Sequence, residues 1–257
     1  MSDHSPHFSA RDFIEYVCRT RDTRPEDFGI RPDVVVSYVG GLPTQVVRWG
    51  LARPAARLFH VAAWNSSEVT LLQGPVGAPQ AAAVMEELNA LGAKRVWVLG
   101  YAGSLKADYA LGTVTGVSQA FSDEGTSRHY ERTGWGIGNA ALMERIRRVN
   151  PELPWVRGWT TDAIYRETPA KIRYFAELGC QVVDMEASCL FHVGHVLGLE
   201  VTAIMVISDE LYHAWRPGFG LPEVEAGIHR AYGILTDVIG ISGSRWDEPG
   251  HELSTSF

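Results

Sequence analysis

The sequence has few cysteines, no excess of basic residues and no long apolar run, and each shortage excludes a class of protein. Its cysteines, Cys18, Cys180 and Cys189, form no CxxC pair and are too few for a disulfide framework, so we expect free thiols. The 23 Lys and Arg against 30 Asp and Glu give a formal charge of −7, which argues against a nucleic-acid-binding protein, because phosphate neutralisation needs clustered cations. Nowhere do about 18 apolar residues follow one another, so no membrane partner is expected. Residues 1–30 lack an apolar core of signal-peptide length, and we expect a cytoplasmic protein.

Several common motifs are also missing. No G-x-G-x-x-G opens a helix after a strand, and neither a G-x-x-x-x-G-K-[ST] loop nor a G-x-S-x-G elbow occurs. His192 and His195 lie three residues apart on a predicted helix, but a third ligand is not in sight, so we expect packing or solvent contact there. We therefore expect no metal and no bound cofactor.

What the sequence does contain is an alternation of two patterns, in a chain of 257 residues that is 46% hydrophobic. Short β-branched runs alternate with segments of helical spacing, which is typical of an α/β fold with a mainly parallel sheet. The predicted strands are 34–39, 69–72, 96–99, 114–117, 155–159, 182–183 and 201–207. The predicted helices are 81–91, 139–149, 169–178, 187–197 and 223–239.

The helix over 169–178 has the clearest boundaries, because Thr168 suits an N-cap, Pro169 the first helical position and Gly179 the end. No repeat or change of composition marks an interior linker. We predict one domain over residues 1–241, with 1–30 as an N-terminal extension and 242–257 as a flexible tail. Its fold is predicted to be a central mixed, mainly parallel twisted sheet flanked by helices.

Polar residues stand at four predicted strand ends, which are 100–103, 160–162, 184–186 and 208–209. Ligands of an open parallel sheet bind outside the carboxyl ends of its strands. Glu186 and Asp209 come after hydrophobic strands, where partial burial raises the pKa of a carboxyl and suits it to donate a proton or hold a hydroxyl. From position alone, the alternative for both is a helix cap or an ion pair.

Six short strings, each in a predicted strand or loop, follow one another along the chain. They are 77–79 (GAP), 100–105 (GYAGSL), 123–130 (DEGTSRHY), 160–168 (TTDAIYRET), 183–187 (VDMEA) and 206–211 (VISDEL). Together and in this order they resemble the nucleoside phosphorylase and nucleosidase superfamily, which includes purine nucleoside phosphorylases, uridine phosphorylases and methylthioadenosine nucleosidases. The resemblance extends from Val34 to Ile239.

The resemblance implies cleavage of the N-glycosidic bond of a nucleoside through a transition state of oxocarbenium character. Met185 and Glu186 correspond to a pair whose thioether packs on the ribose and whose carboxylate accepts hydrogen bonds from its 2′ and 3′ hydroxyls. Ser208 and Asp209 correspond to a pair whose aspartate gives or shares a proton with N7 of a purine, so that the base leaves neutral.

The resemblance also implies a wider set of substrate contacts. These are Gly100, Tyr101, Ala102, Gly103, His129, Ile164, Tyr165, Arg166 and Glu167. Ile164 stands where an aromatic side chain commonly stacks on the base. Asp209 favours a purine, whereas Arg166 and Glu167 are able to pair with the amide edge of a base and leave a uracil-like substrate open.

The nucleophile is where the sequence departs from the phosphorylases. They hold phosphate with a Gly-Asp-Pro-x-Arg loop, which here reads 41–45 (GLPTQ), and with an arginine at the position of Val98. Loss of two guanidinium groups removes the forks that match phosphate best. The nucleosidases use water with a glutamate that falls near Gln45, and an amide accepts no proton at neutral pH.

The region expected to hold the nucleophile or phosphate comprises Gly41, Gln45, Arg48 and Arg57. Hydrolysis of a purine nucleoside is the favoured reading, with inorganic phosphate as the alternative co-substrate. A uridine or pyrimidine-type phosphorylase and a catalytically degenerate nucleoside-binding protein are the other readings. Because one subunit of the relatives completes the site of another, a homo-oligomer is expected, whether dimer, trimer or hexamer.

Overall fold

The computed structural model describes residues 6–58, 61–130 and 132–241, and its centre is one ten-stranded sheet. Its strands are β1 (Asp33–Ser37), β2 (Ala63–Asn65), β3 (Val69–Gln73), β4 (Arg95–Ser104), β5 (Val114–Ser122), β6 (Gly134–Ile137), β7 (Trp155–Thr160), β8 (Val182–Asp184), β9 (Glu200–Glu210) and β10 (Arg216–Pro217). The predicted tail, 242–257, lies outside the described residues.

Seven α-helices and three short 3-10 helices connect these strands in the described chain. They are α1 (Ala10–Arg21), η1 (Pro25–Phe28), α2 (Leu42–Arg48), α3 (Ala78–Ala90), η2 (Thr126–Tyr130), α4 (Ala140–Val149), η3 (Ile164–Arg166), α5 (Pro169–Glu177), α6 (Ala187–Leu197) and α7 (Pro222–Ile239). None of the helices in the described ranges has the length and apolar character that a membrane span requires.

The sheet is mixed and partly closed on itself. Parallel pairing joins β1 to β3 and β4, β4 to β9, and β7 to β5 and β8. Antiparallel pairing joins β9 to β5 and β10, β8 to β4, β2 to β3, and β6 to β5. Strands β4, β9, β5, β7 and β8 therefore pair in a ring, and β1, β3 and β2 extend it on one side. The predicted mixed sheet is confirmed, with antiparallel pairs as frequent as parallel ones among the described strands.

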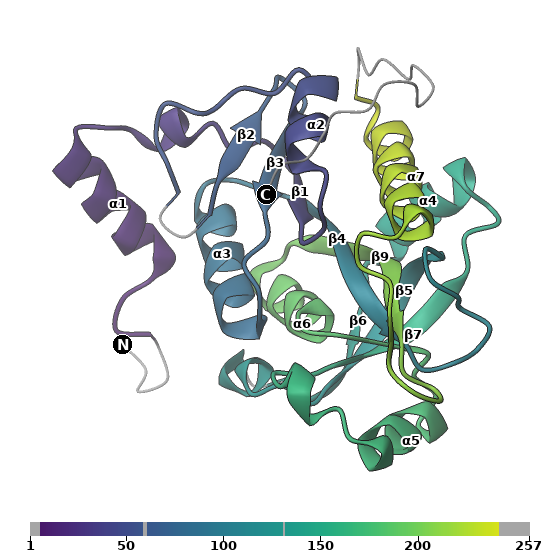
Figure 1. The fold of residues 1–257 in the computed structure, drawn as a ribbon. Coiled ribbons are helices and arrows are strands. Elements are labelled where there is room, and N and C mark those ends of the chain that lie inside the picture. Colours follow the sequence, from purple (N-terminus) through teal and green to yellow (C-terminus); the bar gives the residue numbers. More distant parts are fainter. Residues whose placement is uncertain (1–5, 59–60, 131, 242–257) are drawn as a thin grey trace.

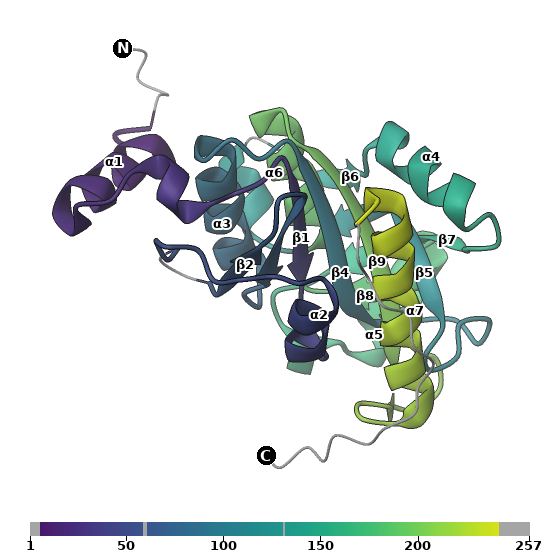
Figure 2. The same ribbon diagram turned by 90° about the horizontal axis from the view of Figure 1, so that it is seen from above.

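Helices cover the sheet on both faces. Figure 2 shows α3 and α6 on one side of β1 and β4, and α4 and α7 on the other. Helices α3 and α6 pack against each other, while α7 packs on β9. Figure 1 shows α5 at the bottom of the view, below β7, and the helix belongs to the connection between β7 and β8. The predicted flanking helices are thus confirmed.

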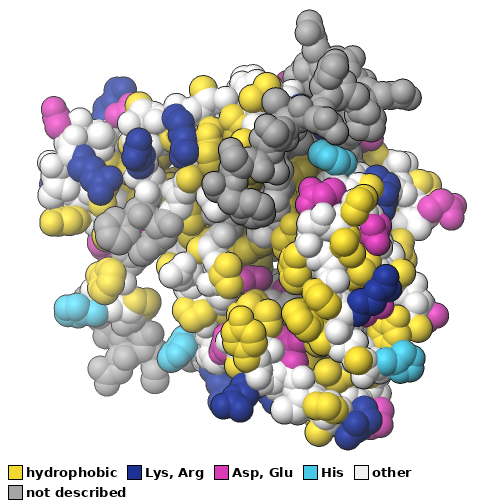
Figure 3. Space-filling view, viewed as in Figure 1, with side chains coloured by type: hydrophobic (Ala, Val, Ile, Leu, Met, Phe, Trp, Pro, Cys, Tyr) yellow, Lys and Arg dark blue, Asp and Glu magenta, His cyan; other side chains and the backbone are white. Residues whose placement is uncertain are grey.

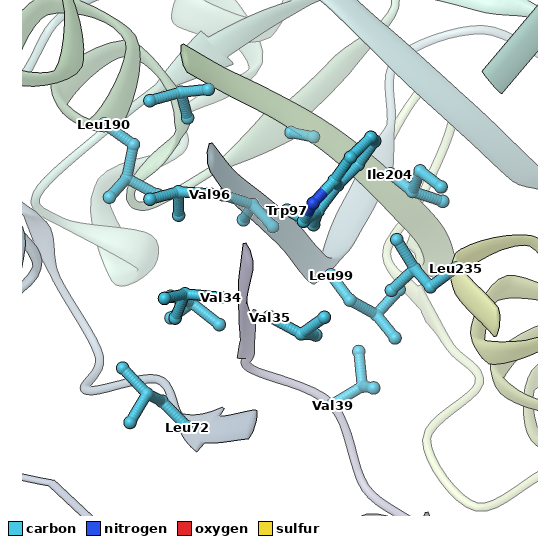
Figure 4. Packing of buried hydrophobic residues seen from close by; sticks show 14 of the residues in the cluster. Val34, Val35, Val39, Leu72, Val96, Trp97, Leu99, Leu190, Ile204 and Leu235 are labelled. Carbon is cyan, nitrogen blue, oxygen red and sulfur yellow. The ribbon is translucent and has the colours of Figure 1, made fainter. Parts of the chain in front are cut away.

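The core lies between the sheet and these helices. Figure 4 shows Val35 of β1, Leu99 of β4 and Ile204 of β9 on the side of the sheet that faces Leu235 of α7, and Val34 of β1 on the opposite side. All five side chains are completely buried. Burial of an aliphatic side chain of this size contributes about 1.5 to 3 kcal/mol relative to leaving it in water, so this cluster fixes the central strands and their carboxyl ends.

Two predicted strand ends are wrong. Residues 100–103 lie inside β4 and residues 208–209 inside β9, because these two strands pair side by side far beyond their apolar runs. The register shifts where Ala102 faces Ile207 and Gly103 faces Asp209, so Ser208 is an extra residue on β9. A β-bulge of this kind re-aims side chains near a site.

Helices α1 and α2 are absent from the sequence prediction. Ser9 and Asp12 form a capping box at the start of α1, a signal that the sequence carries in the predicted N-terminal extension. Gly41 adopts a positive φ of 79° as the N-cap of α2, and Pro43 lies in the first turn of that helix.

Candidate active site

The described ends of β1, β4, β8 and β9 surround a cavity of about 190 Å³. Loops after β3 and β7 and the segment before α7 complete its wall. Its lining residues are Tyr38, Val76, Tyr101, Ala102, Gly103, Ile164, Glu167, Val183, Asp184, Met185, Glu186, Ser208, Asp209 and Phe219. On the face seen in Figure 3, acidic and hydrophobic side chains likewise lie side by side near the middle of the molecule.

The junction of β8 and α6 places Met185 and Glu186 in the cavity. Asp184 anchors this junction, because its Oδ2 accepts hydrogen bonds from the backbone N–H groups of Glu186 and Ala187 at 2.9 and 2.6 Å. Its Oδ1 accepts another from the Thr160 hydroxyl at 2.7 Å. Asp184 therefore satisfies the first amides of α6 and fixes the direction of the two residues after it.

Glu186 is 8% exposed, and its Oε1 accepts a hydrogen bond from the Gly77 N–H at 2.6 Å. Burial, with a further contribution from the charge of Asp184, raises the pKa of Glu186 to about 8. The carboxyl therefore holds a proton in much of the empty protein at neutral pH. Hydrogen-bond donors of a ligand would favour its ionised form.

Ser208 and Asp209 lie at the bulge of β9. The Ser208 hydroxyl donates to Asp209 Oδ1 at 2.8 Å, and the indole Nε1–H of Trp215 donates to Asp209 Oδ2 at 3.1 Å. Both oxygens of Asp209 thus accept a hydrogen bond from this chain.

Tyr101 and Tyr38 lie at the end of the cavity formed by β1 and β4. The Tyr101 hydroxyl accepts a hydrogen bond from the Gly40 N–H at 3.3 Å. The hydroxyl of Tyr38 is buried and has no hydrogen-bond partner within the described part of the chain. A Cβ at Gly74 would lie 2.6 Å from the Tyr38 ring, so only glycine at that position leaves room for the ring.

Three apolar residues of the lining are partly open to solvent. Val76, Ile164 and Phe219 are exposed by 71%, 48% and 56%, respectively. The ring of Phe219 meets that of Tyr101 edge to face, with centroids 5.5 Å apart. An aromatic face thus borders the cavity from the segment before α7.

The cavity is strongly acidic. Its described lining includes the carboxyl groups of Glu167, Asp184, Glu186 and Asp209, and no Lys, Arg or His. Burial, and secondarily the charge of Asp209, raises the pKa of Glu167 to about 7. Nearby carboxyl groups raise one another's pKa because like charges disfavour ionisation.

The structure brings together most of the predicted site residues. Those that line the cavity are Tyr101, Ala102, Gly103, Ile164, Glu167, Met185, Glu186, Ser208 and Asp209. Tyr38 and Phe219 also line it, although no sequence motif indicated them. Tyr38 belongs to the predicted strand 34–39 and Phe219 to a segment with no periodic pattern, and only the packing of distant segments reveals that both line the cavity.

Some of the predicted substrate contacts lie elsewhere. Gly100 is buried within β4, where an added Cβ would lie 2.6 Å from the Met205 sulfur, so it serves packing. Tyr165 is 96% exposed, and Arg166 and His129 are exposed too, without lining the cavity.

The predicted nucleophile region also lies outside the lining. Gln45 is 4% exposed and thus packed within the fold, and Gly41 lies against Ile228 and Tyr232 of α7. Arg48 belongs to α2 and does not line the cavity. Arg57 lines a separate cavity, whose other described lining residues are Arg53, Pro54, Leu58, Val61, Ala62 and Ala63.

No group of three or more His, Cys, Asp or Glu residues in the described ranges is arranged to hold a metal. His192 is buried on α6, where its Nε2 lies 3.4 Å from the Gly134 carbonyl oxygen. His192 and His195 border a separate cavity, together with Trp135 of β6.

Comparison with known proteins agrees with this architecture. A family model described as the phosphorylase superfamily matches residues 42–224. A guanosine phosphorylase from Halorubrum lacusprofundi is 25% identical over 194 residues, which are 69% of this chain and 78% of that protein.

Solved structures share the fold at lower identity. A uridine phosphorylase from Vibrio fischeri superposes with a TM-score of 0.70 at 24% identity, over 82% of this chain and 92% of its own. An AMP nucleosidase from Bacteroides thetaiotaomicron superposes with a TM-score of 0.69 at 20% identity, over 90% of this chain and 98% of its own. Because the family model matches more than half of this chain, the chain belongs to the phosphorylase superfamily of glycosyl-bond-cleaving enzymes, as its motifs predict.

Proposed function

We propose that this protein hydrolyses the N-glycosidic bond of a purine nucleoside and releases the free base. The observation that carries the proposal is the charge of the cavity, whose described lining has four carboxyl groups and no cation. A phosphate dianion binds where guanidinium or ammonium groups surround it, and the described lining supplies none. Water carries no charge and is the nucleophile that such a cavity admits.

The sugar is expected to lie against Met185 and Glu186. The carboxylate of Glu186 then accepts hydrogen bonds from the 2′ and 3′ hydroxyls of the ribose. Such bonds strengthen as positive charge develops on the sugar in the transition state. The raised pKa of Glu186 in the empty protein fits this role, because hydrogen bonds from the ribose hydroxyls favour the ionised carboxylate.

The base is expected to lie between Ile164 and Phe219, with its polar edge toward Asp209. Phe219 supports the proposal because it supplies the aromatic face that Ile164 does not. A purine is favoured over uracil, since Asp209 lines the cavity and the exposed Arg166 does not.

The test is a panel of purine and pyrimidine nucleosides incubated without phosphate and with phosphate in excess, followed by chromatography of bases and sugars. We expect free base and free ribose at the same rate under both conditions. Formation of ribose 1-phosphate only when phosphate is present would refute hydrolysis and favour the phosphorylase reading, with a cation supplied from outside this cavity.

Two other outcomes decide between the remaining readings. Cleavage of pyrimidine nucleosides alone would contradict the purine assignment. Tight nucleoside binding in calorimetry with no product from any nucleoside would favour the catalytically degenerate binding protein.

A further inference from the structure

The string 123–130 (DEGTSRHY) contains a buried carboxyl group that does not line the cavity. His129, the substrate contact predicted from this string, is exposed, whereas Glu124 is only 2% exposed. Glu124 lies between β5 and η2, and its carboxyl group accepts five hydrogen bonds within the described chain. Removing a carboxylate from water is costly unless donors surround it, so the position of these donors indicates what Glu124 does.

Four of the five donors belong to the same turn as Glu124. Its Oε2 accepts from the backbone N–H groups of Thr126 and Ser127 at 2.6 and 3.0 Å. Its Oε1 accepts from the Ser122 hydroxyl at 2.8 Å and from the Ser127 hydroxyl. Burial by itself raises the pKa of Glu124, but these hydrogen bonds together hold it below its usual value. Glu124 is therefore a carboxylate at neutral pH, and the turn fixes its place.

The fifth donor comes from α6, which starts at the cavity. The Ser188 hydroxyl donates to Glu124 Oε1 at 3.2 Å. Ser188 is completely buried and lies two residues after Glu186, in the first turn of α6. Its own N–H donates to the Thr160 hydroxyl oxygen at 2.9 Å. The first turn of α6 is thus bound to the segment after β5 and to the end of β7.

The turn that holds Glu124 is itself bound to the chain at the end of β7. The Asp123 N–H donates to the Thr160 carbonyl oxygen at 3.0 Å, and the Gly125 N–H donates to Asp162 Oδ2 at 2.9 Å. The carboxylate of Glu124 is therefore a fixed point of the fold. A shift of the first turn of α6 against the sheet would have to break its hydrogen bond to this point.

We propose that Glu124 is a positioning residue for nucleoside cleavage, which holds the first turn of α6 through Ser188 and thereby sets the orientation of Glu186 toward the ribose. The hydrogen bonds from Asp184 shape the junction of β8 and α6 locally, whereas Glu124 ties that junction to β5. This inference rests on the proposed function, since it takes the ribose to lie against Glu186. A small displacement of that carboxylate weakens bonds that are strongest in the transition state.

The test compares guanosine with 2′-deoxyguanosine in variants of the full chain, with phosphate in excess so that release of the base is measured whichever nucleophile reacts. The deoxynucleoside lacks the 2′ hydroxyl that Glu186 is expected to bind. The ratio of kcat/KM for guanosine to kcat/KM for 2′-deoxyguanosine therefore reports on that contact. A loss of folded protein lowers both values equally and leaves the ratio unchanged.

The first variant is Ser188→Ala, which removes the hydroxyl that reaches Glu124. The matched control is Ser118→Ala, which makes the same chemical change on β5. Ser118 donates to the Val156 carbonyl oxygen at 2.9 Å and is not among the residues that line the cavity. Urea denaturation of each variant shows that it is folded and compares the two losses of stability.

We expect Ser188→Ala to lower the ratio by about tenfold, because a misplaced carboxylate gains less from the 2′ hydroxyl. Ser118→Ala should lower the urea midpoint to a similar extent and leave the ratio unchanged. A second variant, Glu124→Gln, should lower the ratio in the same direction as Ser188→Ala. Its amide accepts at one atom only, and its NH2 group would face donors of the turn.

Two results would overturn the proposal. One is an unchanged ratio in Ser188→Ala or in Glu124→Gln, including an equal loss of activity with both nucleosides. The other is an equal fall of the ratio in Ser118→Ala, which would show that the loss of any buried hydroxyl has this effect. If the unaltered protein cleaves neither nucleoside, the proposed function fails and this inference with it, and that outcome is recognised before any variant is compared.

Discussion

Glu186 is buried where the ionised form of its carboxyl is disfavoured. It is 8% exposed, close to the charge of Asp184, and among protein groups only backbone amides stabilise its ionised form. Binding sites commonly keep such groups at a cost to stability, because the ligand supplies the partners that the fold withholds. The pKa of Glu186, raised to about 8, is the measure of that cost.

This leads to a prediction for Glu186→Gln. The folded-state pKa of about 8 lies above the value of about 4.3 in an unfolded chain, so the folded protein binds more protons between these pH values. Its free energy of unfolding therefore falls as pH rises through this window. An amide does not ionise, so the variant should be more stable than the unaltered protein near pH 9, by roughly 2 to 4 kcal/mol.

Thermal melting at a series of pH values checks this expectation. Near pH 4 both proteins carry an uncharged side chain at this position, and their melting temperatures should agree. A variant that is less stable near pH 9 would show that the Glu186 carboxylate stabilises the empty protein. The same variant should lose nucleoside cleavage, because a neutral amide holds the ribose hydroxyls less strongly.

At the scale of elements, the helices with clear boundary signals were predicted well and the strand ends were not. Helix α5 begins after the Thr168 cap and α6 spans 187–197, both as expected. The ends of β4 and β9 were wrong because hydrogen bonds between strands extend past the apolar residues that the pattern detects. Pairing is a tertiary property, and so is the bulge at Ser208.

The cap of α5 also bears on the site, because Thr168 follows Glu167 directly. Its hydroxyl accepts a hydrogen bond from the Lys171 N–H at 3.3 Å. Thr168→Ala should lower the free energy of unfolding by about 1 kcal/mol, and Thr168→Ser should retain it. Urea denaturation measures both. An alanine variant as stable as the serine variant would mean that the hydroxyl does not cap the helix.

At the scale of the whole molecule, the ring of strands brings four distant segments to one cavity. The ends of β1, β4, β8 and β9 are separated by most of the chain, and their pairing through β4 places them together. Ser104 and Val182 pair in an antiparallel bridge that closes the ring beside the cavity. The shape of the site therefore depends on the whole sheet rather than on any one motif.

The assembly of the protein is a prediction at the same scale. The resemblance to enzymes whose subunits complete one another's sites leads us to expect a homo-oligomer. Light scattering after gel filtration should give a mass of two or more chains, and the mass should persist on dilution through the range used for activity. If the protein has the mass of one chain at concentrations where it is fully active, this expectation is wrong.

The sequence by itself determined the fold class, the family and the carboxyl groups of the site. Strand and helix periodicity predicted the mixed sheet and its helices, and the strings around Met185, Glu186 and Asp209 indicated the superfamily. These properties reside in residue types and their order, which local propensity and burial of apolar faces turn into structure.

Only the tertiary structure decided which of those residues meet. It turned Glu167 inward while Arg166 stayed exposed, added Tyr38 and Phe219, and left Gln45, Arg48 and Arg57 outside the cavity lining. The physical reason is that the charge and pKa of a site depend on burial and on groups far apart in the chain, which pairing and packing bring together. The acidic, cation-free lining on which the proposed hydrolysis rests is a property of that packing.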